Sequence, residues 1–368
     1  MDLPVMPPLL PMLARPAPEV PEPDATAAGY VYEPKWDGFR AIVYRDGAEV
    51  RIDSRNARPM ERYFPEVVDA VRAALPERCV VDGEIVLAQD GRLEFEVLSQ
   101  RIHPAASRVR LLAEQTPASL VVFDVLALGD DDLTALPLGR RQEVLDGLGL
   151  DGPQVHATPR TRDVGLARQW FDQFEGAGLD GVVAKPLDGT YQANKRAMLK
   201  IKHGREADVV LAGYRLHKSS TVAQPLVGSL LLGLHDDEGR LQFVGVAASF
   251  PMARRAELVA ELAPLVVEPG TSQADDHPWS GWENPAGERM PGAVSRWSAG
   301  KDLSFTPLRP ERVLEVAYDH MEGARFRHTA RFRRWRDDRD PASCTYAQLD
   351  EPVRYDLGGI LPGAPGVA

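Results

Sequence analysis

Short strand-like runs near the start of the chain restrict it to folds that contain antiparallel sheet. Three such runs cover residues 30–35, 39–45 and 48–53, and the Asp-Gly pair at 46–47 is typical of a hairpin turn. The stretch KWDGFR, residues 35–40, brings a lysine into otherwise apolar and aromatic surroundings. A lysine that only aids solubility needs no acid two residues later and no arginine five residues later. The pattern suggests a reactive lysine at the end of a strand.

The rest of the first 200 residues mixes predicted helices with strands. Apolar residues at helical spacing run through MERYFPEVVDAVRAALP, and the last proline stops that helix. Shorter helices are expected in FEVLSQRI and GLARQWFDQFEGAG. Further strands are expected in CVVDGEIVLAQDG, SLVVFDVLALG, DGVVAKP and MLKIKH. This mixture indicates an α+β domain over residues 1–204, in which the Pro- and Ala-rich residues 1–28 wrap a surface.

After residue 204 the sequence is dominated by predicted strands. Strands with hairpin turns are expected in ADVVLAGYR, LVGSLLLGLHDDEGRLQFVGVAAS, RVLEVAYDHM and ARFRHTARFRRWR, and one helix is expected in MARRAELVAELAPLV. About five strands and one helix are typical of a small β-barrel. We therefore predict a second domain over residues 205–350 and a loose C-terminal tail over residues 351–368.

Composition and charge narrow the class of protein. The chain has 368 residues, of which 44% are hydrophobic and 26% charged, as in an ordinary globular protein with two domains. Its net charge of −11 argues against general binding to nucleic acid, although two basic stretches, residues 185–218 and 323–340, offer local sites for phosphates. On charge alone, solvated and salt-bridged faces explain these stretches better.

Cysteine usage and the apolar runs indicate the compartment. Cys79 and Cys344 match no metal-ligand spacing and no disulfide framework, which favours a reducing cytoplasm. The N-terminal stretch MDLPVMPPLLPMLARP lacks the basic segment of a signal peptide. No apolar run is long enough to cross a bilayer, so no membrane partner is expected.

Lys35 has neighbours that suit a nucleophilic amine. A free lysine, with a pKa of about 10.4, is a poor nucleophile at neutral pH, and burial or a nearby cation favours its neutral form. Arg40 or a bound metal supplies such a charge, Asp37 can orient the amine or hold the metal, and Gly38 lets the backbone pass close to a ligand. The alternative is a strand lysine that only pairs with Asp37, and the KxDG pattern alone does not decide between the two.

Five further blocks place polar or charged residues within or beside apolar strands. Glu84 lies inside VVDGEIV, where an unpaired carboxylate is costly, and Asp180 and Lys185 flank the apolar centre of LDGVVAKP. Each block alone is typical of a core or a solvent face, but together they predict one cleft. The residues singled out in the five blocks are Ser54, Arg55, Asn56, Glu84, Phe123, Asp124, Asp180, Lys185, Lys200 and Lys202.

These blocks resemble, in order and spacing, the motifs of the covalent nucleotidyltransferases, above all those of the ATP-dependent DNA ligases. EPKWDGFR is similar to motif I, DSRN to Ia, VVDGEIV to III, VVFDVLAL to IIIa, DGVVAKP to IV, MLKIKH to V and RFRRWRDDRDP to VI. The resemblance covers about residues 5–345. Motif I lies almost at the start, without room for the helical DNA-binding domain of larger ligases, so the chain most resembles the compact bacterial, actinobacterial ligase C type.

The resemblance implies a nucleotidyltransferase domain, with ATP-grasp-like antiparallel sheets and helices, followed by an OB-fold β-barrel domain. It implies an enzyme that seals nicks in duplex DNA through a lysyl-AMP intermediate on Lys35, in DNA repair and recombination. ATP would be the substrate and Mg²⁺ or Mn²⁺ the metal. It also implies a monomer in the cytoplasm that joins the nucleoid on DNA, with Ku or a repair polymerase as candidate partners.

By the same resemblance, the blocks supply the nucleotide site. Phe123 would stack on adenine, Glu33 would lie beside the base, and Glu84 would bind the ribose. Asp180 would hold the metal, with Asp37 as a second candidate ligand. Contacts to phosphate or ribose are implied for Arg40, Arg55, Arg196, Lys200 and Lys202, and contacts to pyrophosphate in the first step for Arg336 and Arg339.

The chain departs from the family pattern at two positions. Motif IV usually has Glu where this chain has Asp180, one methylene shorter, which leaves the metal geometry open. Motif VI usually ends in Lys where this chain has Arg339, which keeps the charge and offers two N–H groups to pyrophosphate.

Two other kinds of function stay open from the sequence. An RNA ligase or an mRNA-capping guanylyltransferase would use the same lysine chemistry, although the Glu-Pro before Lys35, the Ser-Arg-Asn block and the barrel-like second half favour a DNA ligase. A catalytically silent nucleic-acid-binding module would share the fold, but no motif has lost its key residue type.

Overall fold

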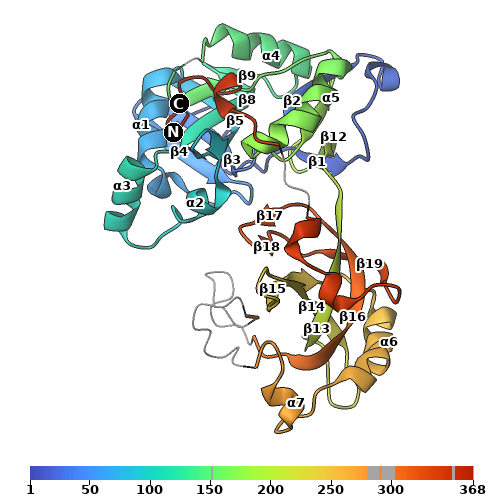
Figure 1. Cartoon of the computed structure of the whole chain (residues 1–368). Helices are drawn as coiled ribbons and strands as arrows, with labels where there is room; N and C mark the ends of the chain where they lie inside the picture. Colours follow the sequence, from blue (N-terminus) through green and yellow to red (C-terminus); the bar gives the residue numbers. More distant parts are fainter. Residues whose placement is uncertain (151, 281–289, 292–302, 350–352, 368) are drawn as a thin grey trace. The chain divides into compact units, whose positions relative to one another are not determined.

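In a computed structural model of the full chain, the backbone forms two compact units (Figure 1). Unit 1 consists of Met1–His203 together with Pro352–Ala368, and unit 2 consists of Gly204–Glu351. The first border therefore lies beside the residue at which the sequence changes in texture. The structure describes every residue except 151, 281–289, 292–302, 350–352 and 368. The predicted border between barrel and tail, at residues 350–351, lies outside the described residues.

A six-stranded sheet forms the centre of unit 1. Its strands follow the order β10-β8-β5-β3-β4, with β9 paired to β8, and all neighbours are antiparallel except β10 and β8. The Asp-Gly turn joins β3 to β4 as a hairpin, as the sequence predicted. The strands are β3 (Phe39–Asp46), β4 (Glu49–Ser54), β5 (Arg78–Val86), β8 (Ser119–Leu128), β9 (Asp131–Asp132) and β10 (Val155–Ala157).

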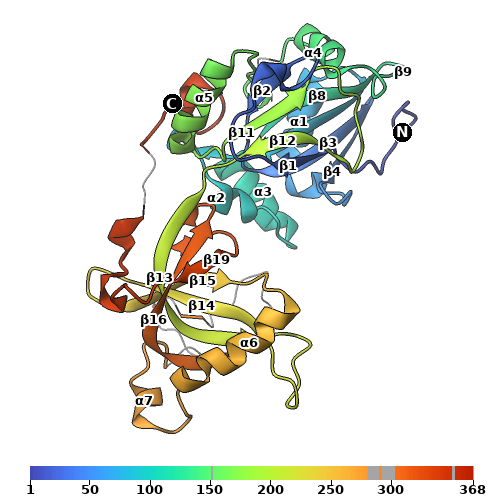
Figure 2. The same cartoon turned by 90° about the vertical axis from the view of Figure 1, so that its right-hand side faces the viewer.

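A four-stranded sheet with the order β1-β12-β11-β2 completes the strand framework of unit 1 (Figure 2). Its edge strand β1 pairs in parallel with β12, so part of the N-terminal stretch that was expected to wrap a surface belongs to a sheet. A small hairpin follows β5. The strands are β1 (Leu13–Pro16), β2 (Tyr30–Pro34), β11 (Val182–Pro186) and β12 (Arg196–Ile201), and the hairpin consists of β6 (Ala88–Gln89) and β7 (Arg92–Leu93).

Alternating side chains of β3 explain how the layers of unit 1 pack. Val43 points into a core that includes apolar residues of helix α1, whereas Ile42 and Tyr44 point into another core with Met198 of β12. This is the two-residue period of a strand buried on both faces. Helix α5 covers the four-stranded sheet through Ala167. The helices are α1 (Pro65–Ala74), α2 (Phe95–Ser99), α3 (Ala106–Gln115), α4 (Leu138–Gly147) and α5 (Val164–Gln173).

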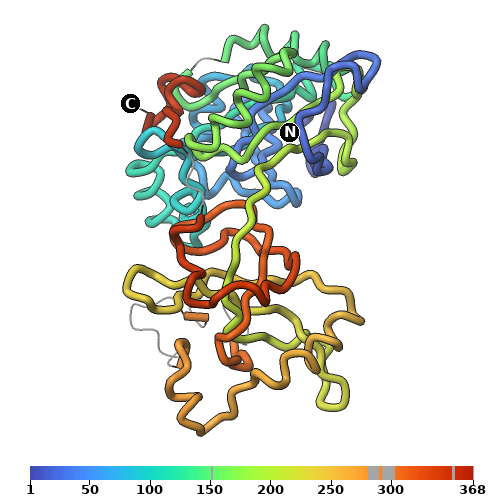
Figure 3. The backbone as a smooth tube through the Cα atoms, turned by 45° about the vertical axis from the view of Figure 1, so that its right-hand side comes forward, coloured from blue at the N-terminus to red at the C-terminus, as the bar shows by residue number. Residues whose placement is uncertain are grey.

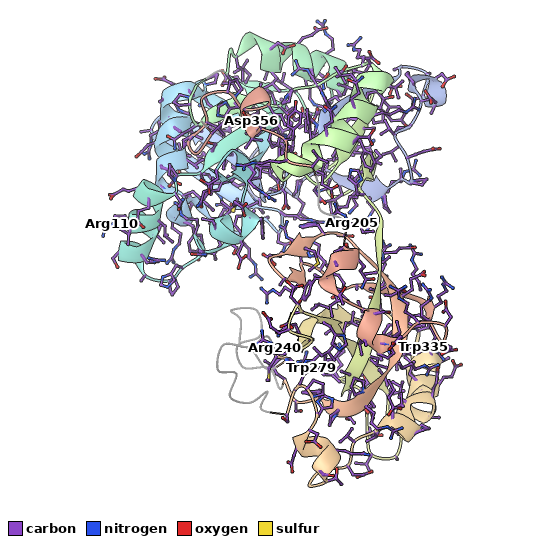
Figure 4. The ribbon with its side chains drawn as sticks, in the orientation of Figure 1. Arg110, Arg205, Arg240, Trp279, Trp335 and Asp356 are labelled. Atoms are coloured by element: carbon purple, nitrogen blue, oxygen red, sulfur yellow. The ribbon has the colours of Figure 1, made fainter. Side chains whose placement is uncertain are left out.

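Unit 2 is a five-stranded barrel. Its sheet has the order β15-β14-β13-β16-β19, and a bridge between Ala247 of β15 and Ala330, just before β19, closes the ring. Apolar side chains fill the interior, including Trp279, which is 1% exposed (Figure 4). The sheet strands are β13 (Arg205–Leu216), β14 (Val227–His235), β15 (Leu241–Ala247), β16 (Thr306–Tyr318) and β19 (Arg331–Trp335). The remaining elements are α6 (Met252–Leu262), α7 (Ser272–Asp275), β17 (Met321–Glu322) and β18 (Arg325–Phe326).

The five strands and the helix expected after residue 204 are therefore present, with α6 following β15. The short helix α7 is additional. Among the described residues of both units, no helix combines the length and the apolar character needed to cross a membrane.

The C-terminal segment, residues 353–367, packs on unit 1, so the prediction of a loose tail was wrong. Its many glycines and prolines suggested a mobile end, but its aliphatic side chains are covered. Leu357, Ile360 and Leu361 are 0%, 7% and 1% exposed and join a cluster with Phe174. Burial of a large aliphatic side chain contributes about 1.5–3 kcal/mol, which ties this segment down. Figure 3 shows the red C-terminal end beside the blue-green part of the chain.

Candidate active site

Lys35 directly follows β2 and is fixed by the neighbouring chain. Its backbone N–H donates to the carbonyl oxygen of Gly181 at 2.8 Å, and the N–H of Asp180 donates to the carbonyl oxygen of Lys35 at 2.9 Å. Gly181 has a φ of +113°, and a Cβ there would lie 2.0 Å from the carbonyl oxygen of Ile201. Since only glycine suits this position, the Asp-Gly pair places the Asp180 side chain beside Lys35.

Asp180 joins two lysines through one oxygen atom. Its Oδ2 lies 2.6 Å from Nζ of Lys35 and 2.8 Å from Nζ of Lys202. Burial acts to raise the pKa of Asp180, but the two ammonium groups outweigh burial and hold that pKa well below its usual range. The carboxylate is therefore ionised at neutral pH and keeps both amines in place.

Lys200 adds a third amine. Lys200 and Lys202 are two residues apart at the end of β12, so their side chains leave the chain on the same face. Burial, Lys202 and Lys35 lower the pKa of Lys200, and Arg55, exposed in the turn after β4, acts in the same direction. We call Lys35, Lys200, Lys202 and Asp180 the lysine cluster. Three amines around one carboxylate suit a polyanionic ligand such as a triphosphate.

Arg40 lies on β3 opposite Glu84 of β5 and is held by a carboxylate that the sequence analysis did not single out. Nε and Nη2 of Arg40 lie 2.5 and 2.6 Å from the two oxygens of Asp82, and the hydroxyl of Tyr191 donates to Asp82 at 2.7 Å. The sequence could have pointed to Asp82, because it is a charge within the apolar run VVDGEIV, but nothing in the sequence marks Tyr191. Burial raises the pKa of Glu84 to about 7, although Arg40 and Lys35 act against burial.

Glu33, two residues before Lys35, forms a buried ion pair with Lys185. Oε2 of Glu33 lies 2.6 Å from Nζ of Lys185, and Glu33 is 2% exposed. The other oxygen, Oε1, is also buried and has no hydrogen-bond partner among the residues that the structure describes. The ring centroid of Phe123 lies 4.4 Å from Nζ of Lys185 and 4.5 Å from Cζ of Arg40. A free buried acceptor near an aromatic ring suits a planar ligand with an N–H donor.

Gly38 and Asp37 follow Lys35 and serve different purposes. A Cβ at Gly38 would lie 2.1 Å from the carbonyl oxygen of Ile85 on β5, so the approach of the two backbones already requires this glycine. The glycine at position 38 is thus explained without the close contact to a ligand that the sequence suggested. The charge of Asp37 contributes to the raised pKa of Glu84, which places Asp37 within electrostatic range of that carboxyl group.

No contact among the described residues links three predicted residues to the lysine cluster. Arg196 is exposed at the start of β12, four residues before Lys200, which is about 13 Å along an extended strand. Arg336 and Arg339 lie in unit 2, where Nη1 of Arg336 is 3.0 Å and Nε of Arg339 is 3.5 Å from Oδ2 of Asp208. Contacts or charge interactions connect the other predicted residues, which are Glu33, Lys35, Asp37, Arg40, Arg55, Glu84, Phe123, Asp180, Lys200 and Lys202.

Comparison with known proteins assigns both parts of the chain to one family. Residues 11–202 match the family of the ATP dependent DNA ligase domain, and residues 223–339 match the ATP dependent DNA ligase C terminal region. The chain is 58% identical to DNA ligase C of Mycobacterium tuberculosis over 99% of both chains. It is also 58% identical to DNA ligase C2 of Mycolicibacterium smegmatis, over 96% of this chain and 97% of that protein.

A solved structure from work on Lig E DNA ligases shares the fold. Its TM-score is 0.54 at 16% identity, over 89% of this chain and 99% of that chain. The predicted nucleotidyltransferase domain and OB-fold domain are thus confirmed, and DNA ligase activity with ATP is the function rather than RNA ligation, capping or silent binding. The chain belongs to the ATP-dependent DNA ligases.

Proposed function

We propose that this ligase stores AMP on Lys35 and then transfers it to the 5′-phosphate at a nick in duplex DNA. The observation that carries the proposal is the lysine cluster, in which Lys35 and Lys202 share Asp180 and Lys200 lies within electrostatic range. A triphosphate needs an excess of cations, and an attacking amine needs a position close to the α-phosphate. The cluster supplies both.

The chemistry proceeds in three displacement steps. The ammonium group of Lys35 first loses a proton to water. Its Nζ then attacks the α-phosphorus of ATP, a nitrogen–phosphorus bond forms, and the bond from the α-phosphorus to the oxygen that bridges it to the β-phosphate breaks with release of pyrophosphate. An oxygen of the 5′-phosphate at the nick then displaces Lys35 and takes the AMP. Finally the 3′-hydroxyl attacks that 5′-phosphate, which seals the strand and releases AMP. Lys200 and Lys202 would stabilise the charge that grows on the α-phosphate.

Glu33 offers a reason for the use of ATP rather than GTP. Adenine stacked on Phe123 would donate its 6-amino group to the free Oε1 of Glu33, whereas guanine presents a carbonyl oxygen that this acceptor repels. Glu33→Gln has both a donor and an acceptor, so it should change the preference for ATP over GTP in adduct formation by roughly tenfold or more. Glu84→Gln, at the proposed ribose contact, is the control and should slow both nucleotides equally.

Mg²⁺ or Mn²⁺ is the proposed metal. Within the described part of the chain, no group of three or more His, Cys, Asp or Glu side chains is placed to hold a metal, so a cage made by the protein alone is not indicated. Mg²⁺ in nucleotide enzymes binds through one or two carboxylates together with substrate phosphates, and Asp180 with Asp37 fits that requirement. When bound, the metal neutralises triphosphate charge that would otherwise repel the nucleophile.

The wider role that we propose is DNA repair and recombination, by a monomer in the cytoplasm and on the nucleoid. Support comes from the similarity over nearly the full length to proteins named DNA ligase C, and from Cys79 and Cys344, which are buried free thiols. Ku or a repair polymerase are the partners that the family resemblance suggests. Sealing of nicked duplexes with DNA or RNA on either strand tests which substrate is preferred.

The AMP adduct tests the central proposal. After incubation with ATP and Mg²⁺, intact-mass analysis should show one added AMP on the unmodified sequence and none on Lys35→Ala. Lys218→Ala removes an exposed lysine of unit 2 and should keep the adduct. An adduct on Lys35→Ala would overturn the assignment of the nucleophile.

A further inference from the structure

The C-terminal segment, residues 353–367, helps to form the wall behind the adenylation site. Leu357 and Leu361 are buried in one apolar cluster with Trp36 and Phe123. Trp36 directly follows the proposed nucleophile, and Phe123 is the ring proposed to stack on adenine. A segment that follows the barrel in the sequence is therefore part of the same apolar cluster as two residues of the proposed nucleotide site.

Backbone hydrogen bonds attach the segment to the hairpin that follows β5. The N–H of Leu357 donates to the carbonyl oxygen of Gly91 at 2.9 Å, and the N–H of Gly91 donates to that of Gly366 at 3.2 Å. Nη2 of Arg354 donates to the carbonyl oxygen of Asp90 at 3.1 Å. The hairpin directly follows β5, which carries Glu84, so these bonds also attach the segment beside the strand that holds Glu84. Figure 4 labels Asp356 of this segment among the elements of unit 1.

Two glycines permit this close docking. A Cβ at Gly176, in the 3-10 helix Phe174–Ala177, would lie 1.8 Å from the carbonyl oxygen of Val353. A Cβ at Gly366, which has a φ of +78°, would lie 2.0 Å from the carbonyl oxygen of Ala88. One glycine belongs to the body of unit 1 and the other to the segment, so both surfaces are shaped for the contact.

Trp36 is held from two sides. Its Nε1 donates to Oγ1 of Thr158 at 2.9 Å, and its apolar surface belongs to the cluster that the segment completes. Without the segment, one side of that support is lost. We propose that residues 353–367 are a positioning element of the adenylation step, because they keep Trp36 and Phe123 in place around Lys35. This proposal rests on the proposed role of Lys35.

Gly176→Ala in the full chain tests the proposal without altering the segment. Its methyl group would meet the backbone of Val353 and displace the segment, so self-adenylation should slow by about 10- to 100-fold, with a higher KM for ATP. Gly147→Ala is the matched control, since a Cβ there meets nothing within 4 Å. On the segment itself, Leu361→Ala should raise the KM, whereas Val353→Ala, at an 89% exposed residue, should not.

Thermal unfolding of the full-length variants separates positioning from stability. If residues 353–367 only stabilise the fold, Gly176→Ala should lower the melting temperature but leave the rate of adenylation unchanged well below that temperature. The proposal is overturned if Gly176→Ala and Leu361→Ala, as folded full chains, adenylate like the unmodified sequence. The role of Lys35 fails separately, by an adduct on Lys35→Ala.

Discussion

Two dense groups of cations in this chain differ in what neutralises them. In unit 1 Lys35 and Lys202 both lie against the carboxylate of Asp180, and Lys200 lies within electrostatic range of them. In unit 2 four arginines of β19 and the following turn lie against carboxylates. The pairs are Arg333 with Glu206 at 3.5 Å, Arg334 with Glu315 at 2.7 Å, Arg336 with Asp338 at 2.9 Å and with Asp208 at 3.0 Å, and Arg339 with Asp208 at 3.5 Å.

The difference lies in which strands supply the acids. Glu206 and Asp208 come from β13 and Glu315 comes from β16, so the barrel adds counter-charges from distant strands to the one that Asp338 supplies locally. In unit 1 the lysine cluster has Asp180, from the loop just before β11. Lysines from different elements that meet around one carboxylate, rather than a basic run, therefore mark the site suited to phosphates. The arginines of unit 2 have to exchange partners before they can bind phosphate.

The largest effect is expected from Arg336→Ala combined with Arg339→Ala. If these arginines leave Asp208 to stabilise departing pyrophosphate, the double variant should lose about 100-fold or more of self-adenylation. It should still seal a nick that already carries AMP on its 5′-phosphate, because that reaction needs no pyrophosphate release. Arg333→Ala, on β19 just before the pair, is the control. Loss of both activities would assign the pair to DNA binding or folding, and loss of neither would leave them as surface ion pairs.

Asp180→Asn tests the lysine cluster of unit 1. A neutral amide is a weaker ligand for a hard cation and cannot neutralise two ammonium groups, so sealing at limiting Mg²⁺ should slow by roughly tenfold or more. Raising Mg²⁺ or adding Mn²⁺ should recover part of the rate. Asp188→Asn, at an exposed residue of the same unit, should behave like the unmodified sequence. Unchanged sealing at limiting metal would remove Asp180 from the proposed metal site.

The salt dependence of DNA binding distinguishes a cation that already has a carboxylate partner, such as Arg334, from an exposed lysine such as Lys195. Binding to a nicked duplex should weaken steeply with salt, because bound counter-ions are released from the DNA. Loss of the exposed Lys195 should lower the slope of log affinity against log salt by about 1 if it contacts a phosphate. Arg334→Ala should lower it less, since Arg334 already pairs with Glu315. A flat dependence for the unmodified sequence would mean that both basic stretches are ordinary solvated faces.

The smallest effect concerns the stability of unit 1. The pKa of Glu84 is raised from 4.5 to about 7, so between these values the folded chain binds more protons than the unfolded chain. The contribution of Glu84 to the unfolding free energy therefore falls as pH rises from about 4.5 to about 7, and it stays constant above pH 7. Glu84→Gln should remove this fall, about 1–3 kcal/mol between pH 5 and pH 8. Denaturant unfolding with a chelator present measures it, and identical pH profiles would contradict it.

Local patterns explain which elements were predictable. The runs at 30–35, 39–45 and 48–53 correspond to β2, β3 and β4 within one residue at each end, since turn residues and two-residue alternation are local signals. Helices α3 and α4 were not predicted. In α3 only Val109 and Leu112 are buried, so its apolar stripe is too narrow to be read from the sequence.

The residues of the site also divide into those that local sequence patterns identified and those that they did not. Lys35, Glu84 and Asp180 were identifiable because each is a charge at or within an apolar run. Tyr191, by contrast, reaches Asp82 across 109 residues and has no unusual neighbours in the sequence. Gly38 was assigned to a ligand because its contact with the backbone of β5 cannot be seen before the strands are paired.

The sequence by itself determined most strands of this ligase, though not β1 or β10, and the charges that interrupt them, because alternation, turn residues and motif spacing are properties of neighbouring residues. Tertiary structure alone decided which cations find a counter-charge on a distant strand and which distant segment packs in one cluster with Trp36. Arg336 finds Asp208 across 128 residues, and residues 353–367 return to unit 1 after the whole barrel. Strand register and the shape of a distant apolar surface decide such contacts, and neither is written in a local pattern.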